Sequence, residues 1–320
     1  MPRVQVAVLG DLVLDEYVFG RSDRISREAP VVIVRELRRE QVLGGAANVA
    51  AGVLALGARC EPVGVVGDDP PGEAIAELLA ARGARGRGLV RVRGWTTEIK
   101  TRILAGGAST TPQQILRLDR GHGGGLPKEA ERRLLQALRR AASAADVLVV
   151  SDYGLGTLGS ALVRTVRRLA AERPVLVDSR FHLGGWHGAT WAKPNLPELE
   201  ALLGVSVDGA ADAARAARQL KNRLGLRGVL LTRGHQGMTL VDGRRRPLHL
   251  PVFGPGEAVD VTGAGDTVMA TFAAALAAGA SPEAAARLAN VAGGLAVLKP
   301  GTATVSAEEL REAVETGRVP

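Results

Sequence analysis

Short apolar segments alternate with helix-like segments along almost the whole chain, and this alternation is the strongest constraint on the fold. The clearest apolar segments span residues 4–9, 63–67, 146–151, 174–177 and 228–232, and each ends at or just before a glycine, an acidic or a hydroxyl residue. Such alternation predicts an α/β fold with a doubly wound, mainly parallel sheet flanked by helices. Because ligands of these open sheets bind at the carboxyl ends of the strands, we expect the functional residues there.

A glycine-rich turn precedes an apolar helix near the end of the sequence. Gly263 and Gly265 lie at the start of a segment, residues 266–278, that is almost entirely apolar and is followed by Gly279. Glycines permit a sharp turn, and the amides at a helix N-terminus attract anions, phosphate above all. Asp266 in the first helical turn is either a structural cap or a carboxylate that takes a proton from an attacking hydroxyl, and the spacing alone leaves both roles open.

Composition narrows the class of protein. The 320 residues carry a net charge of +8, but only 3% are aromatic and the arginines are spread along the expected helices, so we expect no nucleic-acid partner. We interpret the excess charge as a compositional bias, with a few arginines directed at anionic substrates. No apolar run approaches the roughly 20 residues that span a bilayer, no signal peptide is evident, and the single Cys60 excludes an internal disulfide. These features predict a cytoplasmic protein that does not enter the membrane.

Acidic side chains follow two of the expected strands. Asp11 and Asp15 come after the first strand, and Asp152 comes after the strand that ends at residue 151. Ionised carboxylates are strong acceptors for sugar hydroxyls, so these three residues are candidates for substrate binding. An ordinary loop acid is the alternative for Asp15.

Two motifs more than two hundred residues apart resemble the signatures of the ribokinase-like (PfkB) sugar kinases. One runs from Asp260 to Asp266, and the other is the Gly-Gly-Ala-Ala-Asn sequence at residues 44–48. The resemblance implies an ATP-dependent enzyme with Asp266 as general base and the amides of Gly263, Ala264 and Gly265 as an anion hole. In the upstream motif it assigns Gly44, Gly45 and Asn48 to the sugar.

The resemblance extends over essentially the whole chain, which implies a single ribokinase-like domain, residues 1–320. Alternating β-type segments at roughly 14–42 and 89–119 suggest a small separate sheet, as in the β-sheet lid of this family. Such a lid excludes water from phosphoryl transfer and, by analogy with the family, implies a homodimer formed through it. Lys100 and Arg102 lie on the second segment and are candidates for a substrate phosphate, although alternate residues of an exposed strand are often charged anyway.

The family motif Pro-Asn-x-x-Glu falls at residues 194–198. It implies that Asn195 and Glu198 bind the nucleotide phosphates and hydrated Mg²⁺, and the same residues also suit the start of a helix. Asp260 is a candidate ligand for a monovalent cation, such as the K⁺ that activates some relatives. The resemblance implies further ATP contacts at Thr232, Gly234 and Asn290.

The segment Arg24-Ile-Ser-Arg-Glu-Ala-Pro30 resembles a segment of the heptose 7-phosphate kinases, although this chain has Arg27 where those kinases usually have proline. These kinases phosphorylate the anomeric hydroxyl of D-glycero-D-manno-heptose 7-phosphate on the way to ADP-heptose, a lipopolysaccharide precursor. They also have an Asp-Tyr-Gly-x-Gly sequence like that at 152–156. We therefore expect this activity. The alternatives are a kinase of another sugar or nucleoside (ribose, fructose or adenosine) and a non-catalytic sugar sensor.

The sequence contains no His-x-Gly-His motif of the adenylyltransferase half of the bifunctional heptose enzymes. We therefore expect a separate protein to perform the adenylyl transfer.

Overall fold

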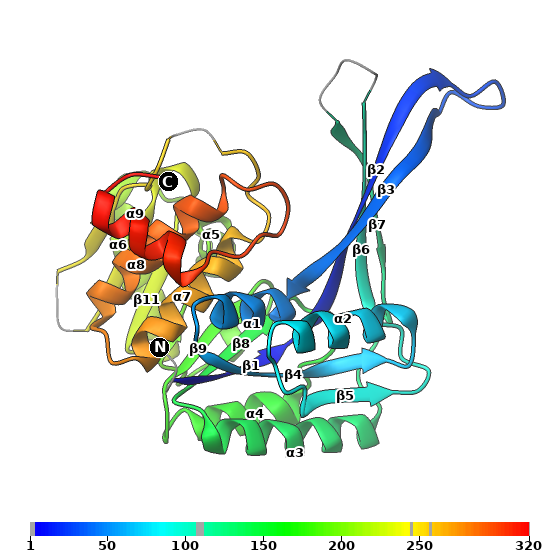
Figure 1. Ribbon diagram of the computed structural model, residues 1–320. Helices are drawn as coiled ribbons and strands as arrows, with labels where there is room; N and C mark the ends of the chain where they lie inside the picture. The colour runs from blue at the N-terminus through cyan, green and yellow to red at the C-terminus, as the bar shows by residue number, and fades with distance from the viewer. Residues whose placement is uncertain (1–3, 107–111, 244–245, 256–257, 320) are drawn as a thin grey trace.

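A computed structural model describes residues 4–106, 112–243, 246–255 and 258–319, which form a main sheet flanked by helices and a second, smaller sheet that projects from it (Figure 1). The main sheet has nine strands in the order β13-β12-β11-β10-β9-β8-β1-β4-β5. In this order, all neighbouring strands from β5 to β11 are parallel. Strand β12 is antiparallel to both of its neighbours, β11 and β13. These strands are β1 (Gln5–Gly10), β4 (Arg59–Gly67), β5 (Gly88–Val92), β8 (Val147–Asp152), β9 (Val175–Ser179), β10 (Trp191–Ala192), β11 (Gly228–Thr232), β12 (Met238–Asp242) and β13 (Leu248–Leu250). The doubly wound, mainly parallel sheet predicted from the sequence is confirmed.

Helices cover both faces of the main sheet, and each face has its own core. Strand β1 shows why, because Val6 and Val8 enter one core while Ala7 and Leu9 enter the other, and all four are fully buried. On the first face lie α1 (Ala46–Ala55), α2 (Pro70–Ala81), α7 (Ala264–Ala277) and α8 (Pro282–Ala296), with α9 (Ala307–Thr316) packed on α8. On the other lie α3 (Lys128–Ala144), α4 (Ser160–Leu169), α5 (Leu196–Leu203) and α6 (Gly209–Leu224).

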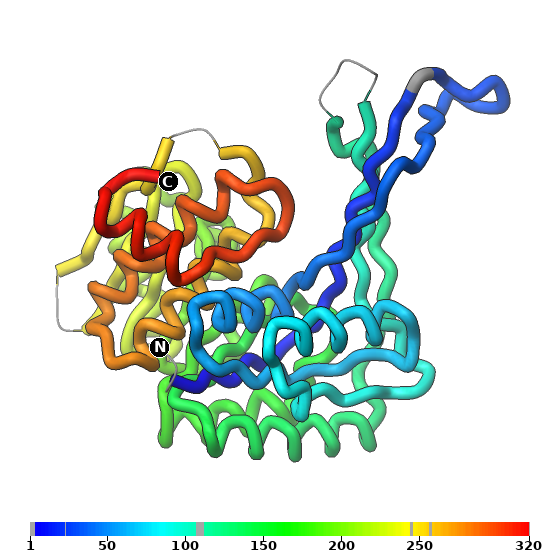
Figure 2. The backbone as a smooth tube through the Cα atoms, viewed as in Figure 1, coloured from blue at the N-terminus to red at the C-terminus, as the bar shows by residue number. Residues whose placement is uncertain are grey.

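The second sheet stands away from this body, as the tube in Figure 2 shows. Its order is β3-β2-β6-β7, with β2 (Leu12–Ile25), β3 (Val32–Gly45), β6 (Glu98–Gly106) and β7 (Gln113–Arg120). The expectation that residues 89–93 belong to this sheet was wrong, because β5 pairs with β4 at the edge of the main sheet. A short, half-buried apolar run fits either sheet, and only the pairing partner decides.

The base of the small sheet is buried, and its outer part is exposed. Leu12, Val13 and Leu14 are at most 2% exposed, whereas Leu37 is 66% exposed. Ile25, Val32, Ile33, Ile115, Leu116 and Leu118 are exposed as well. Within the described ranges, no helix is long and apolar enough to cross a membrane.

Candidate active site

The carboxyl ends of several main-sheet strands and the N-terminus of α7 enclose a cavity of about 210 Å³. Its lining is almost entirely polar, as expected where parallel strands end together. The lining residues are Asp152, Tyr153, Asp178, Arg180, Lys193, Asn195, Glu198, Gly263, Gly265 and Asp266. Six of these ten were expected from the sequence, and Tyr153, Asp178, Arg180 and Lys193 were not.

Asp266 is only 4% exposed, and its carboxylate is held by two other segments of the chain. Asn48 Nδ2 donates to Oδ2 at 2.9 Å, and Tyr153 OH donates to Oδ1 at 2.8 Å. The N-cap of α7 is Gly263, and no side chain caps that helix. Asp266 therefore does not serve as the cap that the sequence left possible, since its bonds are to α1 and to the loop after β8.

The pKa of Asp266 is raised to about 6, chiefly by burial, and the nearby Asp178 carboxylate acts in the same direction. The hydrogen bonds from Asn48 and Tyr153 and the charge of Lys193 act in the opposite direction, because they favour the ionised form. A carboxylate with a pKa near 6 is largely ionised at neutral pH, and its affinity for a proton is higher than that of an exposed aspartate. This is the property that a general base requires.

The turn before α7 can be built only from glycine at its first position. Gly263 has a φ of 77°, and a Cβ there would lie 2.9 Å from Asn48 Nδ2 and 2.8 Å from Thr302 Cγ2. A side chain at this position would thus push away the amide that holds Asp266. The amides of the first turn have no intrahelical acceptor, and Gly263 and Gly265 line the cavity, so their amides can serve an anion there. The amide of Ala264, which was expected to act with them, donates to Val261 O at 3.3 Å.

A buried lysine lies beside this turn, and the sequence reasoning missed it. Lys193 is 5% exposed, its Nζ lies 2.7 Å from Asp178 Oδ2, and a Cβ on Gly265 would lie 3.5 Å from the same Nζ. Burial alone would lower the pKa of Lys193, but the Asp178 carboxylate, with Glu198 and Asp266, raises it above its usual value. Lys193 is thus a fixed positive charge beside the glycine turn. The signal in the sequence was its place directly before the Pro194-Asn195 motif.

Asn195 and Glu198 form a capping box at the start of α5 and also line the cavity. Glu198 N donates to Asn195 Oδ1, and Asn195 N donates to Glu198 Oε2. Burial raises the pKa of Glu198. Across the described ranges, no group of three or more His, Cys, Asp or Glu side chains could hold a metal directly. A carboxylate and an amide beside a phosphate site instead suit Mg²⁺ that keeps most of its water ligands.

The expected sugar-binding residues lie where β2, β3 and α1 meet. Asp15 is 5% exposed, pairs with Arg102 Nη1 at 2.7 Å and accepts from Thr302 Oγ1 at 3.0 Å. A Cβ on Gly44 would lie 2.5 Å from Asp15 Oδ2, so glycine there leaves room for the carboxylate. A Cβ on Gly45, whose φ is 55°, would meet the carbonyl oxygen of Asp11.

The two other expected acids hold the chain around the cavity. The Asp11 carboxylate accepts from the backbone amides of Tyr153 (2.7 Å), Leu155 and Thr157, and burial raises its pKa. Asp152 accepts from Ser179 Oγ at 2.6 Å. Both side chains thus fix the loop that carries Tyr153. Lys100 lies over the Tyr153 ring, with Nζ 4.8 Å from the ring centre, and burial lowers its pKa.

The three further residues expected to contact ATP, Thr232, Gly234 and Asn290, and the candidate cation ligand Asp260 lie outside the cavity lining. Thr232 ends β11 and its amide donates to Pro194 O, while Gly234 begins a short 3-10 turn. Asn290 lies on α8, and its side-chain amide donates to Pro251 O at 2.8 Å. Asp260 accepts from the amides of Thr262 and Gly301; burial alone would raise its pKa, but these bonds lower it.

A buried carboxylate beside a glycine turn and a fixed lysine fits the class of enzymes that transfer a phosphoryl group to a hydroxyl, which need a base and a set of groups that stabilise phosphate charge. Residues 4–310 match the pfkB family of carbohydrate kinases. The chain belongs to that family, and the prediction of an ATP-dependent sugar kinase is confirmed at this level.

Curated relatives are similar over almost the whole chain. The bifunctional protein HldE of Halorhodospira halophila is 44% identical over 320 residues, which cover 99% of this chain and 65% of the relative. The bifunctional protein HldE of Trichlorobacter lovleyi is 41% identical over 310 residues, which cover 96% of this chain and 62% of the relative. This chain thus spans less than two thirds of the length of these relatives.

Solved structures confirm the fold. Arabidopsis thaliana ribokinase complexed with ribose and ATP superimposes with a TM-score of 0.76 at 20% identity, covering 98% of this chain and 99% of that one. Phosphofructokinase-2 from Escherichia coli in complex with potassium gives a TM-score of 0.79 at 22% identity, covering 99% of both chains. The ribokinase-like architecture expected from the two motifs is therefore present.

Proposed function

We propose that the protein phosphorylates the anomeric hydroxyl of D-glycero-D-manno-heptose 7-phosphate with ATP, giving the 1,7-bisphosphate. The observation that carries the kinase mechanism is the buried Asp266 carboxylate, held by Asn48 and Tyr153 beside the glycine turn. The choice of heptose is supported by the likeness to the HldE proteins and by the segment at residues 24–30.

In this mechanism Asp266 acts as the general base. It accepts the proton of the anomeric hydroxyl as that oxygen bonds to the γ-phosphorus and the bond to the ADP oxygen breaks. The proton then leaves Asp266 to solvent, which restores the carboxylate. Because the pKa of Asp266 is about 6, the ionised form that accepts the proton predominates at neutral pH.

The anion hole and Lys193 would stabilise the transferred phosphoryl group. Gly263 and Gly265 line the cavity at the positive end of α7, and their amides, with that of Ala264 once it leaves Val261 O, would bind the phosphoryl oxygens. Lys193 brings a charge that its ion pair with Asp178 keeps in place. Mg²⁺, when bound, neutralises charge on the nucleotide phosphates. Asn195 and Glu198 would hold it through its water ligands, and Thr232, Gly234 and Asn290 stay proposals for ATP contacts.

The sugar would lie between the cavity and the small sheet. Asp15, Asn48, Gly44 and Gly45 are placed to bind hydroxyls, with Asp11 and Asp152 behind them holding the loop. Lys100 and Arg102 would face the 7-phosphate, and the small sheet would close over it as a lid of the single domain. Arg102 already carries an ion pair with Asp15, so the less constrained charge is that of Lys100.

We also propose that two copies associate through the small sheet. The hairpin between β2 and β3, which contains residues 26–31, lies at the end of this sheet farthest from α7 (Figure 1). Residues of the heptose-like segment would therefore reach a sugar most readily in a second protomer. The exposed apolar side chains along the sheet, Leu37 among them, are the surface such a contact would bury.

Leu37→Glu should separate this dimer, because it places a charge in the proposed interface. Light scattering should give about twice the monomer mass for the unchanged protein and the monomer mass for the variant. Val314→Glu, which changes a side chain of comparable exposure on α9, serves as the control and should leave the mass unchanged. A monomeric unchanged protein would remove the dimer from the proposal.

A separate protein would perform the adenylyl transfer that converts the product toward ADP-heptose. We propose a cytoplasmic location for the kinase reaction, because it would use ATP and a sugar phosphate. Two alternatives share this site. A kinase of another sugar or nucleoside would keep Asp266 and the glycine turn, and a sugar sensor would bind without turnover.

ADP release decides among these alternatives. We expect turnover with MgATP on heptose 7-phosphate but not on ribose, fructose, fructose 6-phosphate or adenosine, and a fall on the order of 10³-fold in Asp266→Asn. Circular dichroism would show that the variant is folded, and paired assays in KCl and NaCl would test the cation role of Asp260. Turnover on another substrate that is lost in Asp266→Asn would overturn the heptose assignment. No ADP release with any of the five compounds would favour the sugar sensor.

Tyr153→Phe should move the acid limb of the pH–rate profile upward. The Tyr153 hydroxyl favours the ionised form of Asp266, so its loss raises that pKa above about 6, and the base becomes active only at higher pH. We expect a shift of roughly 0.5–1 pH unit. Tyr17→Phe is the matched control, because its hydroxyl meets Thr302 rather than Asp266. An acid limb that stays in place in Tyr153→Phe would show that this hydroxyl does not tune the base.

A further inference from the structure

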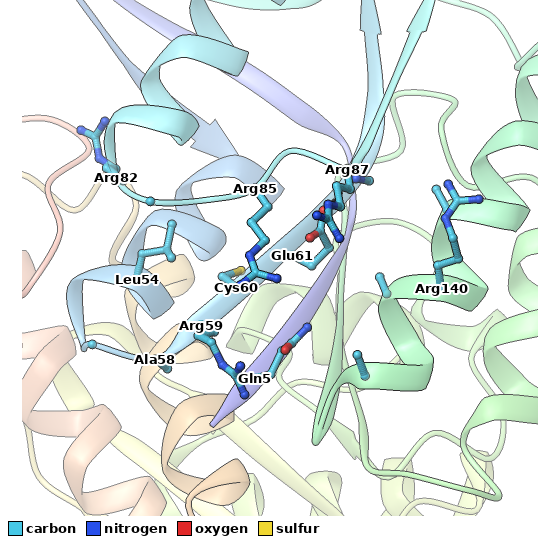
Figure 3. Close-up of a pocket in the computed structure, with 16 residues that line it drawn as sticks. Gln5, Leu54, Ala58, Arg59, Cys60, Glu61, Arg82, Arg85, Arg87 and Arg140 are labelled. Carbon is cyan, nitrogen blue, oxygen red and sulfur yellow. Dashed lines mark hydrogen bonds between the residues drawn. The ribbon is translucent and has the colours of Figure 1, made fainter. Parts of the chain in front are cut away.

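A second and larger cavity lies at the amino ends of the main-sheet strands, opposite the candidate active site. Its volume is about 500 Å³, more than twice that of the cavity beside Asp266. It is formed by the amino ends of β1, β4 and β5, the C-terminal ends of α1 and α3, and the loop after α2 (Figure 3). Nothing in the proposed kinase mechanism uses this cavity, because the reacting groups all lie at the carboxyl ends of the strands.

Arginine dominates the charged lining. Five arginines come from three separate parts of the chain, against a single acid, Glu61. The five are Arg59, Arg82, Arg85, Arg87 and Arg140. Figure 3 shows Arg85 reaching into the middle of the cavity, toward Cys60. Glu61 is 8% exposed, and its carboxylate accepts from the amide of Gly88 at 2.7 Å.

Contacts within the protein account for only part of this cluster. Arg82 Nη1 donates to Leu78 O at 2.9 Å, which is the usual contact of a cation with a helix C-terminus. For the guanidinium groups of Arg85, Arg87 and Arg140, the described part of the chain provides no ion pair or hydrogen bond. Elsewhere in the chain, exposed arginines such as Arg132 and Arg215 pair with an acid three residues away.

The five arginines line one cavity, and positive charges repel one another when they are closer than the screening length of about 8–10 Å in salt. A group of negative charges bound among them would remove this repulsion. Guanidinium groups also present paired donors that match phosphate oxygens. Because the arginines come from three parts of the chain around the cavity, they suit a ligand with more than one phosphate.

The rest of the lining is small and apolar. Leu54, Ala58, Ala137, Ala141 and Ala144 cover the walls between the arginines. A volume of about 500 Å³ falls within the range of ligand pockets that hold a nucleotide-sized molecule. The cavity therefore offers charge for phosphates and an apolar surface for the organic part of the same molecule.

We propose that this cavity is a second binding site, and that its ligand is a small phosphorylated molecule carrying at least two phosphate groups. The site lies at the amino ends of the strands, and α1 runs from it to the proposed kinase site. That helix begins directly after Gly45, carries Asn48 in its first turn and ends at Ala55, with Leu54 of its last turn in the cavity lining. Ten residues of helix span about 15 Å, so the two sites lie at opposite ends of one rigid element.

The double variant Arg85→Gln/Arg87→Gln tests the site. Isothermal titration calorimetry with pyrophosphate, without Mg²⁺, would compare it with the unchanged protein and with Arg215→Gln/Arg218→Gln, which removes the same charge from the exposed face of α6. We expect the cavity variant to weaken pyrophosphate binding at least about tenfold, and the control to leave it unchanged. Orthophosphate should bind far more weakly than pyrophosphate.

Three results would overturn the proposal. Equal pyrophosphate affinity in both variants would place the anion elsewhere, for example at the kinase site. Equal affinity for orthophosphate and pyrophosphate would contradict a site for two phosphates. Binding of duplex DNA that depends on Arg85 and Arg87, and that is tighter than binding of pyrophosphate, would make the cavity part of a nucleic-acid surface. Unfolding temperature without ligand shows that each variant is folded.

Discussion

The structure depends on one buried carboxylate that is held by hydrogen bonds rather than by a salt bridge. Asp266 accepts from Asn48 and from Tyr153, which lie 218 and 113 residues away in the sequence. Burying such a charge is costly unless it is hydrogen-bonded, so three distant segments must meet correctly before the charge can exist there. The same arrangement places its pKa near 6, and the fold thus sets the chemistry of the group.

The two ends of the parallel strands differ in how their charged side chains are paired. At the carboxyl ends of the strands, Asp11 accepts from the Tyr153 amide, Asp152 accepts from the Gly154 amide and from Ser179 Oγ, and Lys193 is paired with Asp178. These contacts make the candidate active site rigid before any ligand arrives, which favours electrostatic stabilisation of a transition state. At the amino ends of the strands, the described residues provide no ion pair or hydrogen bond to the guanidinium groups of Arg85 and Arg87, and a bound ligand would supply the balancing charge.

The sequence predicted the fold and the position of Asp266 because both depend on local patterns: alternating apolar segments, and a glycine turn before an apolar helix. It did not reveal Tyr153 and Lys193, whose importance comes from side chains brought near them by the sheet. It also misassigned residues 89–93, because strand pairing is set by tertiary contacts. The excess arginine was interpreted as a bias of composition, and its clustering at one edge is visible only in three dimensions.

A crystal structure with heptose 7-phosphate and a non-hydrolysable ATP analogue tests the central claim most directly. The proposed mechanism predicts that the anomeric oxygen lies about 3 Å from an Asp266 carboxylate oxygen, in line with the γ-phosphorus, and that the γ-phosphate oxygens meet the amides of residues 263–265. An anomeric oxygen turned away from Asp266, or a γ-phosphate bound away from the glycine turn, would contradict it.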